Sequence, residues 1–263
     1  RARGAAQTRL AGRFRARDAV SELLTYGTSA QGARVLLSSE DGDLYVLEQD
    51  GSLAWRHAAA GLTHSLDSGD LDGDGNDELV LAYNVPAERG DGFRSGLTAL
   101  RQDGRMLWSY PLTQYVSSVR VVEFDGAAPA EVLGVTAGGW TQVLNGAGEP
   151  LWSARHAGSM PIVVPVDIEG DGRSELWIGA DDGRVRLLSA VGQLLWDRDL
   201  GGVVRAVAEA DLNDGRTGLL AATLKGEVVA LDSAGAELWR YTLPDVAQGP
   251  SASAARPAAG GLL

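Results

Sequence analysis

The chain has 263 residues, of which 44% are hydrophobic, 35 are glycine and none is cysteine. The formal net charge of −12 disfavours nucleic acid as a partner, and the lack of cysteine excludes disulfides, zinc–thiolate sites and cysteine nucleophiles. No apolar run approaches the ~20 residues of a membrane-spanning helix, so no transmembrane segment is predicted.

The first predicted segment, residues 1–17, is rich in arginine and has no acid before Asp18. Residues 12–17 resemble the outer strand of a preceding or closing blade. A solvated edge strand is expected there, with a basic arm for an acidic partner as the alternative. Because the chain opens on Arg1 without methionine or an apolar signal segment, we expect a processed protein or a fragment.

A repeat centred on tryptophan organises residues 18–247. The tryptophan recurs at intervals of 53, 44, 44 and 43 residues, with glycine four positions and leucine eight positions before it. In the fourth unit, alternating segments and Gly-rich turns predict strands over residues 161–167, 175–180, 184–189 and 193–197. Four-stranded units of this length predict an all-β fold, a β-propeller of antiparallel blades. The five blades, marked by Trp55, Trp108, Trp152, Trp196 and Trp239, are expected at about 18–60, 61–114, 115–157, 158–201 and 202–247.

The second unit contains the motif with the clearest chemistry, an acidic loop over residues 70–79. Acids at alternate positions of a tight, Gly-containing turn converge on one point, as the oxygen ligands of Ca²⁺ must. The expected ligands are the side chains of Asp70, Asp72, Asp74 and Glu78 and the carbonyl of Asn76, with Asp77 pointing away. A helical-hand loop is excluded because its last position would be Leu81 and the flanks are strands.

The corresponding loops of the other units match this pattern to different degrees. The fourth unit keeps acids at the matching positions, and its expected ligand set is Asp167, Glu169, Asp171, Arg173 (at the position of Asn76) and Glu175. The third unit keeps only Glu123, Asp125 and Glu131 and is expected to be metal-free. The fifth, residues 211–215, is one residue short and lacks the distal acid. The first, residues 26–31, should bind no metal.

Several features outside the repeat are candidates for a binding surface. The second unit has extra residues near 85–93, where Arg89 and Phe93 could contact a ligand. Trp140 and Trp177 lie outside the tryptophan register, and packing between blades is expected for both, ahead of a ligand-stacking role. The histidines, which are expected to be structural or surface residues rather than a cluster, are His57, His64 and His156.

The tail, residues 248–263, reads as the start of a further blade or as a disordered Ala/Gly-rich end. Two ring arrangements stay open. The N-terminal strand could complete a sixth blade begun by the tail, or the five blades could belong to a larger ring of six to eight. The second is preferred, because the tail is too short for three strands.

On these residues the chain resembles two repeat families. The loops at 70–79 and 167–176 are similar to FG-GAP/VCBS repeats, the calcium-binding blades of integrin-α-like propellers. The segment from Leu231 to Trp239 is similar to the blade repeat of PQQ-like propellers. The resemblance implies Ca²⁺ between the first and second strands of a blade, an extracellular, cell-surface or periplasmic location, and roles in adhesion, assembly or ligand display.

The sequence therefore predicts a calcium-stabilised module that binds a protein or glycan ligand. Every strong motif is architectural, which favours binding or scaffolding over catalysis. Two enzyme alternatives stay open: a polysaccharide lyase resembling calcium-rich propeller lyases, and a quinoprotein dehydrogenase. Neither a clear basic catalytic residue nor a vicinal cysteine pair supports them.

Overall fold

The computed structural model describes residues 13–27, 32–59, 61–86, 92–155, 158–159, 161–211 and 217–243. These residues form five separate four-stranded antiparallel sheets, which are the blades of a β-propeller. These described segments contain no candidate membrane-spanning helix. Arg89, His156, the loop over 212–215 and the tail after residue 243 lie outside the described residues.

Each blade is a meander whose strands pair in chain order. The first three blades contain β1 (Val20–Tyr26), β2 (Arg34–Ser39), β3 (Asp43–Leu47), β4 (Leu53–Ala58), β5 (Leu62–Gly69), β6 (Glu78–Pro86), β7 (Phe93–Leu100), β8 (Met106–Leu112), β9 (Val116–Val122), β10 (Glu131–Thr136), β11 (Trp140–Leu144) and β12 (Pro150–Arg155). The last two contain β13 (Ile162–Val166), β14 (Glu175–Gly179), β15 (Arg184–Leu188), β16 (Leu194–Asp199), β17 (Val204–Asp211), β18 (Thr217–Thr223), β19 (Glu227–Leu231) and β20 (Glu237–Thr242). The strands predicted for the fourth blade are thus observed within about two residues.

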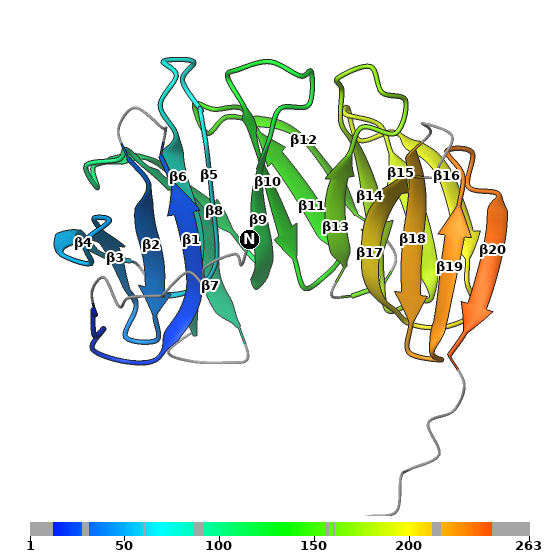
Figure 1. Cartoon of the computed structure of the whole chain (residues 1–263), viewed down its shortest axis with the longest axis horizontal. Coiled ribbons are helices and arrows are strands. Elements are labelled where there is room, and N and C mark those ends of the chain that lie inside the picture. The colour runs from blue at the N-terminus through cyan, green and yellow to red at the C-terminus, as the bar shows by residue number, and fades with distance from the viewer. Residues whose placement is uncertain are drawn as a thin grey trace, which may run out of the picture.

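The blades follow one another in an arc, with the first strands on its inner side (Figure 1). β1 contacts β5, β5 contacts β9, and β13 contacts β17. Because the strands alternate in direction, the connections from first to second and from third to fourth strand lie at one end of a blade. We call this the acidic-loop end, at the top of Figure 1. The connection from second to third strand lies at the opposite end.

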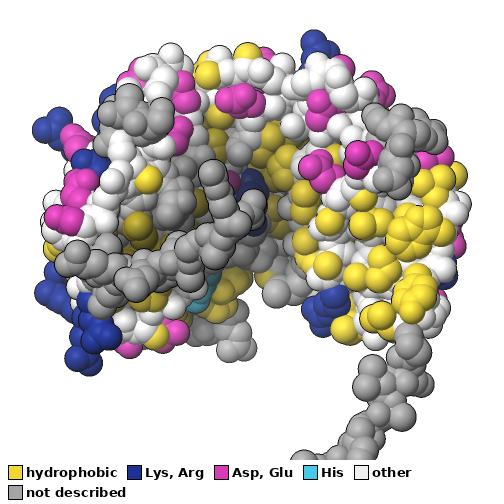
Figure 2. Space-filling model, viewed as in Figure 1, with side chains coloured by type: hydrophobic (Ala, Val, Ile, Leu, Met, Phe, Trp, Pro, Cys, Tyr) yellow, Lys and Arg dark blue, Asp and Glu magenta, His cyan; other side chains and the backbone are white. Residues whose placement is uncertain are grey.

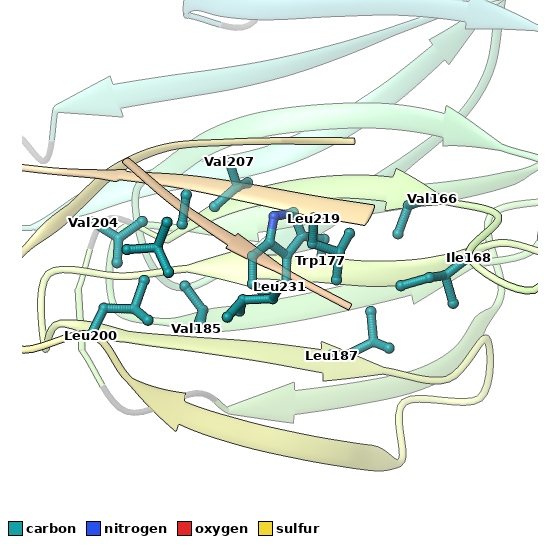
Figure 3. Close-up of a cluster of buried hydrophobic side chains, with 12 residues drawn as sticks. Val166, Ile168, Trp177, Val185, Leu187, Leu200, Val204, Val207, Leu219 and Leu231 are labelled. Carbon is teal, nitrogen blue, oxygen red and sulfur yellow. The ribbon is translucent and has the colours of Figure 1, made fainter. Parts of the chain in front are cut away.

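The hydrophobic core consists of layers between neighbouring blades. The second and third strands are almost wholly buried, as in β3 and β15, whereas the outer strands β4, β12 and β20 are largely exposed. Figure 3 shows the layer between the last two blades, with Trp177 at its centre, fully buried. A single blade has no partner for its apolar faces, so each blade is stabilised by its neighbours.

The repeated tryptophan and glycine are two halves of one contact between neighbouring blades. In four junctions the tryptophan Nε1–H donates to a carbonyl in the turn before the last strand of the next blade. The donor–acceptor distances are 2.7 Å for Trp55–Gln102, 2.8 Å for Trp108–Gly146, 2.9 Å for Trp152–Ala190 and 2.8 Å for Trp196–Ser233. Two residues after each acceptor stands a glycine with positive φ, at Gly104, Gly148, Gly192 and Gly235. A Cβ there would lie within 3.1 Å of the tryptophan ring, which explains the residue type.

The two ends of the arc differ from these junctions. In the last blade Trp239 is 47% exposed, and its indole makes no hydrogen bond within the described part of the chain. Hydrophobic side chains gather on this blade at the right of Figure 2. At the other end, residues 13–17 form no strand, but Phe14 and Ala16 pack on Tyr45 and its neighbours on the first blade.

The two tryptophans outside the repeat register have different environments. Trp177 is buried between the last two blades, as predicted, and its Nε1–H donates to the Leu220 carbonyl at 3.3 Å. Trp140 is 40% exposed, so the expectation of packing between blades is wrong for it. Position explains the difference, because Trp177 lies mid-strand under the next blade, whereas Trp140 opens β11 beside a turn.

The extra residues of the second blade lengthen one hairpin. β6 and β7 pair along their whole length as far as Pro86 and Phe93, and the Phe93 side chain is exposed. Its ring lies edge-on to Tyr115, with centroids 5.1 Å apart. His64 is also exposed beside Tyr115, and no group of potential metal ligands among the described residues includes a histidine.

Candidate metal site and the adjoining pocket

The loop that begins at Asp70 connects β5 to β6 and is organised by the carboxylate of Asp70. Its Oδ1 accepts hydrogen bonds from the backbone N–H of Gly73 at 2.7 Å and of Asp74 at 3.1 Å, and its Oδ2 accepts from Gly75 at 2.9 Å. Gly73 and Gly75 have φ values of 77° and 81°, which L-residues rarely adopt. The Asp-Gly-Asp-Gly pattern thus determines the turn locally.

Three of the predicted ligands converge in this loop. One carboxylate oxygen each from Asp70, Asp72 and Glu78 lies within 4.8 Å of the others. Three hard oxygen donors without nitrogen or sulfur suit Ca²⁺ better than a transition metal. The residues present therefore fit the predicted cation.

The remaining predicted ligands of this loop are placed differently. The Asp74 carboxylate is outside the convergent group and accepts hydrogen bonds from the backbone and side-chain amides of Asn76, at 2.8 and 2.9 Å. These bonds lower the pKa of Asp74. Arg101 also approaches the group, 3.3 Å from Asp72, and a bound cation would compete with this guanidinium for the carboxylate.

The loop of the fourth blade repeats the backbone geometry but not the convergence. Asp167 accepts from the N–H groups of Gly170, Asp171 and Gly172 at 2.7, 3.1 and 2.8 Å, and the Arg173 N–H donates to Asp171 at 2.9 Å. In the described residues, only the second-blade loop brings three acidic ligand atoms together, so the set including Glu169 and Glu175 stays a prediction.

The distal glutamate of these loops has a structural role that the sequence interpretation missed. Glu78, Glu131 and Glu175 each accept a hydrogen bond from the N–H of the residue seven positions earlier, at 3.1, 3.1 and 3.2 Å. Those partners are the buried Leu71, Phe124 and Ile168. A signal was available, since the glutamate persists in the third blade even though that loop has Ala127 at the position of Asp74.

Burial raises the pKa of all three glutamates, and neighbouring negative charges raise it further. Backbone hydrogen bonds oppose this shift but do not cancel it. Glu78 is 2% exposed and faces the charges of Asp70, Asp72 and Asp74. Such a cluster of ionised carboxylates is repulsive unless a cation or protons neutralise it.

Backbone hydrogen bonds join the loops of the second, third and fourth blades into one rim. The Ala130 N–H donates to the Asp70 carbonyl at 2.8 Å, and the Ser174 N–H donates to the Phe124 carbonyl at 3.1 Å. These bonds join the second blade to the third and the third to the fourth. A cation held in one loop would therefore also restrain its neighbour.

A pocket of about 480 Å³ opens at this rim between the third and fourth blades. We call it the loop-end pocket. Its apolar wall is formed by Phe124 and Trp152, whose ring centroids are 6.4 Å apart. Leu151 and Val191 also line it and are 53% and 64% exposed. Its polar lining is charged and consists of Asp125, Glu131 and Arg173.

Glu131 provides a prediction about pH. Burial raises the folded-state pKa of Glu131 above 4.5, its value in the unfolded chain. The contribution of Glu131 to the free energy of unfolding is therefore fully present below pH 4.5, and it is lost as the pH rises through the folded-state pKa. Replacing Glu131 with glutamine, which keeps an acceptor for the Phe124 N–H, is expected to raise Tm at neutral pH. The gain should vanish near pH 4.

Thermal melts across pH 4 to 8 measure this effect, with exposed Glu40→Gln as the control. A Glu131→Gln protein whose Tm difference from the parent does not depend on pH would contradict the assignment.

Comparisons with known proteins agree with this architecture. Residues 181–259 match the family described as outer membrane protein assembly factor BamB, which supports the PQQ-like part of the resemblance. The FG-GAP/VCBS part stays a prediction. No curated protein matches the chain.

Solved structures of low sequence identity share the fold. BBS1N in complex with ARL6DN is 16% identical with a TM-score of 0.61, covering 86% of this chain and 67% of that one. BamB from Moraxella catarrhalis is 17% identical with a TM-score of 0.52, covering 83% and 75%. The WD40 β-propeller domain of Doa1 is 14% identical with a TM-score of 0.57, covering 87% and 70%. The class of fold is therefore the β-propeller.

Proposed function

We propose that this chain is a calcium-stabilised binding module that holds a protein partner at its acidic-loop end. The observation that carries the proposal is the loop-end pocket. Leu151 and Val191 stand exposed around a cavity walled by Phe124 and Trp152, on a rim held by backbone hydrogen bonds. A rigid apolar pocket with charged edges is typical of sites that receive an anchoring side chain.

The charges at the pocket indicate the chemistry of the partner. Asp125 and Glu131 place negative charge beside the apolar wall, and the whole chain has a net charge of −12. A partner segment with one large apolar residue next to lysine or arginine would complement both features. Arg173 on the facing loop would favour an acidic group further along.

Calcium is assigned to the loop at Asp70, with Asp72 and Glu78 as the other side-chain ligands, and to the loop at Asp167 with Glu169, Asp171 and Glu175. The cation would supply positive charge that cancels carboxylate repulsion. Arg173 belongs to the second of these loops and lines the pocket, so calcium there would also stiffen the binding surface.

Similar proteins support a role in assembly. One similar structure was solved as a complex, BBS1N with ARL6DN, and the family that matches residues 181–259 is described as an outer membrane protein assembly factor. A location outside the cytoplasm is part of this proposal, because calcium is abundant enough there for sites of moderate affinity.

A displayed library of random peptides, selected on the intact chain in calcium, tests the proposal. We expect enrichment of peptides with a large apolar residue beside lysine or arginine. Val191→Asp should weaken their binding at least tenfold, while Leu224→Asp, an equally exposed residue outside this pocket, should not. Failure to enrich any peptide, or binding that Val191→Asp leaves intact, would contradict the proposal.

A further inference from the structure

A second pocket, of about 270 Å³, lies at the opposite end of the molecule between the second and third blades. We call it the Trp140 pocket. It is bounded by the end of β8 and the connection to β9, by the last residue of β10, by the first three residues of β11 and by one residue of β12. The residues that line it include Leu112, Gln114, Thr136, Trp140, Gln142 and Ser153.

Trp140 is held in place but left open on one side. Its backbone N–H donates to Thr136 Oγ1 at 3.1 Å, which anchors the start of β11. Its ring is 40% exposed, and its indole N–H has no partner in the described residues. Trp177 and the four junction tryptophans, by contrast, all donate to carbonyls. A solvent-facing indole with a free donor is a stacking platform with one polar edge.

The amide side chains in this pocket are oriented by internal hydrogen bonds. Gln114 Oε1 accepts from Thr136 Oγ1 at 3.0 Å, and its NH₂ group has no hydrogen-bond partner among the residues that the structure describes. Gln114 also lies so close to Gly138 that a Cβ there would collide with it. Gln142 uses its NH₂ group on the carbonyls of Val143 and Trp152, at 3.2 and 3.1 Å, which leaves its Oε1 as an acceptor.

The lining of the Trp140 pocket contains no charged side chain. It offers an aromatic face, a fixed amide donor, a fixed amide acceptor and hydroxyl groups. A sugar ring matches this combination, because its C–H face is apolar and each hydroxyl both donates and accepts. An extended peptide is disfavoured, because β11 is already paired on both sides, with β10 and β12.

The groove continues beyond one ring. A neighbouring pocket of about 490 Å³ shares Leu112 and Thr113 with the Trp140 pocket and reaches Tyr83 and Phe93 on the lengthened hairpin. Phe93 is 41% exposed. Two exposed aromatic residues along one groove suit a chain of sugar units better than a single ring.

We propose that the Trp140 pocket binds a ring of a neutral oligosaccharide, whose next units extend toward Phe93. This site is separate from the loop-end pocket, so an experiment that rejects one assignment leaves the other unaffected. The ring stacks on Trp140, and its hydroxyls pair with the NH₂ group of Gln114 and with Oε1 of Gln142.

Titration calorimetry with short oligomers of glucose, xylose, mannose and N-acetylglucosamine tests this proposal. We expect at least one to bind, with affinity that increases with oligomer length. Trp140→Ala should weaken it at least tenfold and Phe93→Ala less. Trp239→Ala, the matched exposed tryptophan outside the groove, should leave binding unchanged. Gln114→Leu should weaken binding while it keeps the aromatic platform. This second variant still tests the site if Trp140→Ala fails to fold.

Absence of binding to every oligomer would overturn the proposal, as would binding that survives both Trp140→Ala and Gln114→Leu. A peptide that competes for the Trp140 pocket with higher affinity would replace the saccharide assignment with a peptide site. Val191→Asp must leave saccharide binding unchanged, which separates this test from that of the loop-end pocket.

Discussion

Replacing Trp108 with alanine is expected to lower the free energy of unfolding by about 3–5 kcal/mol. The Trp108 indole donates to the Gly146 carbonyl at 2.8 Å and covers Gly148, so the substitution opens a cavity and leaves a carbonyl unpaired. Trp108→Phe keeps most of the packing and should cost less. Denaturant unfolding followed by circular dichroism measures both effects.

The matched control for this prediction is Trp239→Ala. Trp239 occupies the same position in the last blade, yet it is 47% exposed and has no hydrogen bond among the described residues. Its removal should cost less than about 1 kcal/mol. Equal losses for Trp108→Ala and Trp239→Ala would show that the contact between blades is not what stabilises the junction.

The same junction can be tested from the facing blade. A Cβ on Gly148 would lie 2.6 Å from the Trp108 ring, and the backbone there has φ of 82°. Gly148→Ala should therefore lower stability by more than about 1 kcal/mol through both strain and displacement of the ring. A neutral result in the same unfolding experiment would mean that the turn relaxes freely.

Calcium is expected to raise the stability of the chain, and an excess of chelator to lower it. One site at a free concentration of about 100 times its Kd contributes about 2.7 kcal/mol. Asp72→Asn should remove the part of the calcium-dependent stabilisation that comes from the second-blade loop. Asp72 belongs to the convergent group but does not organise the turn. Asp70→Ala is less informative, since three backbone hydrogen bonds depend on that side chain.

The control for the calcium experiment is Asp125→Asn in the third blade, whose loop lacks the full set of acids. It should leave the calcium response unchanged. Glu169→Gln reports separately on the loop of the fourth blade. A melting temperature that is the same in calcium and in chelator would reject the metal assignment in both loops while leaving the propeller fold untouched.

The blade architecture and the local form of the acidic loops could be predicted from the amino-acid sequence. Tryptophan and glycine at a fixed spacing occupy the same environment at every junction, so their periodicity was visible without coordinates. The turns at Asp70 and Asp167 were equally predictable, because a short-range Asp cap and positive-φ glycines act within a few residues.

How these elements contact one another could not be predicted from the sequence, because it depends on packing between blades. The partner of each of the four junction tryptophans lies in the next blade, and the difference in burial between Trp140 and Trp177 depends on what covers them. The convergence of Asp70, Asp72 and Glu78 likewise depends on side-chain directions that the motif alone does not determine. The two pockets could not be predicted from the sequence either. Residues from two blades form their walls, and the pattern within one repeat does not show which residues of the next blade lie nearby.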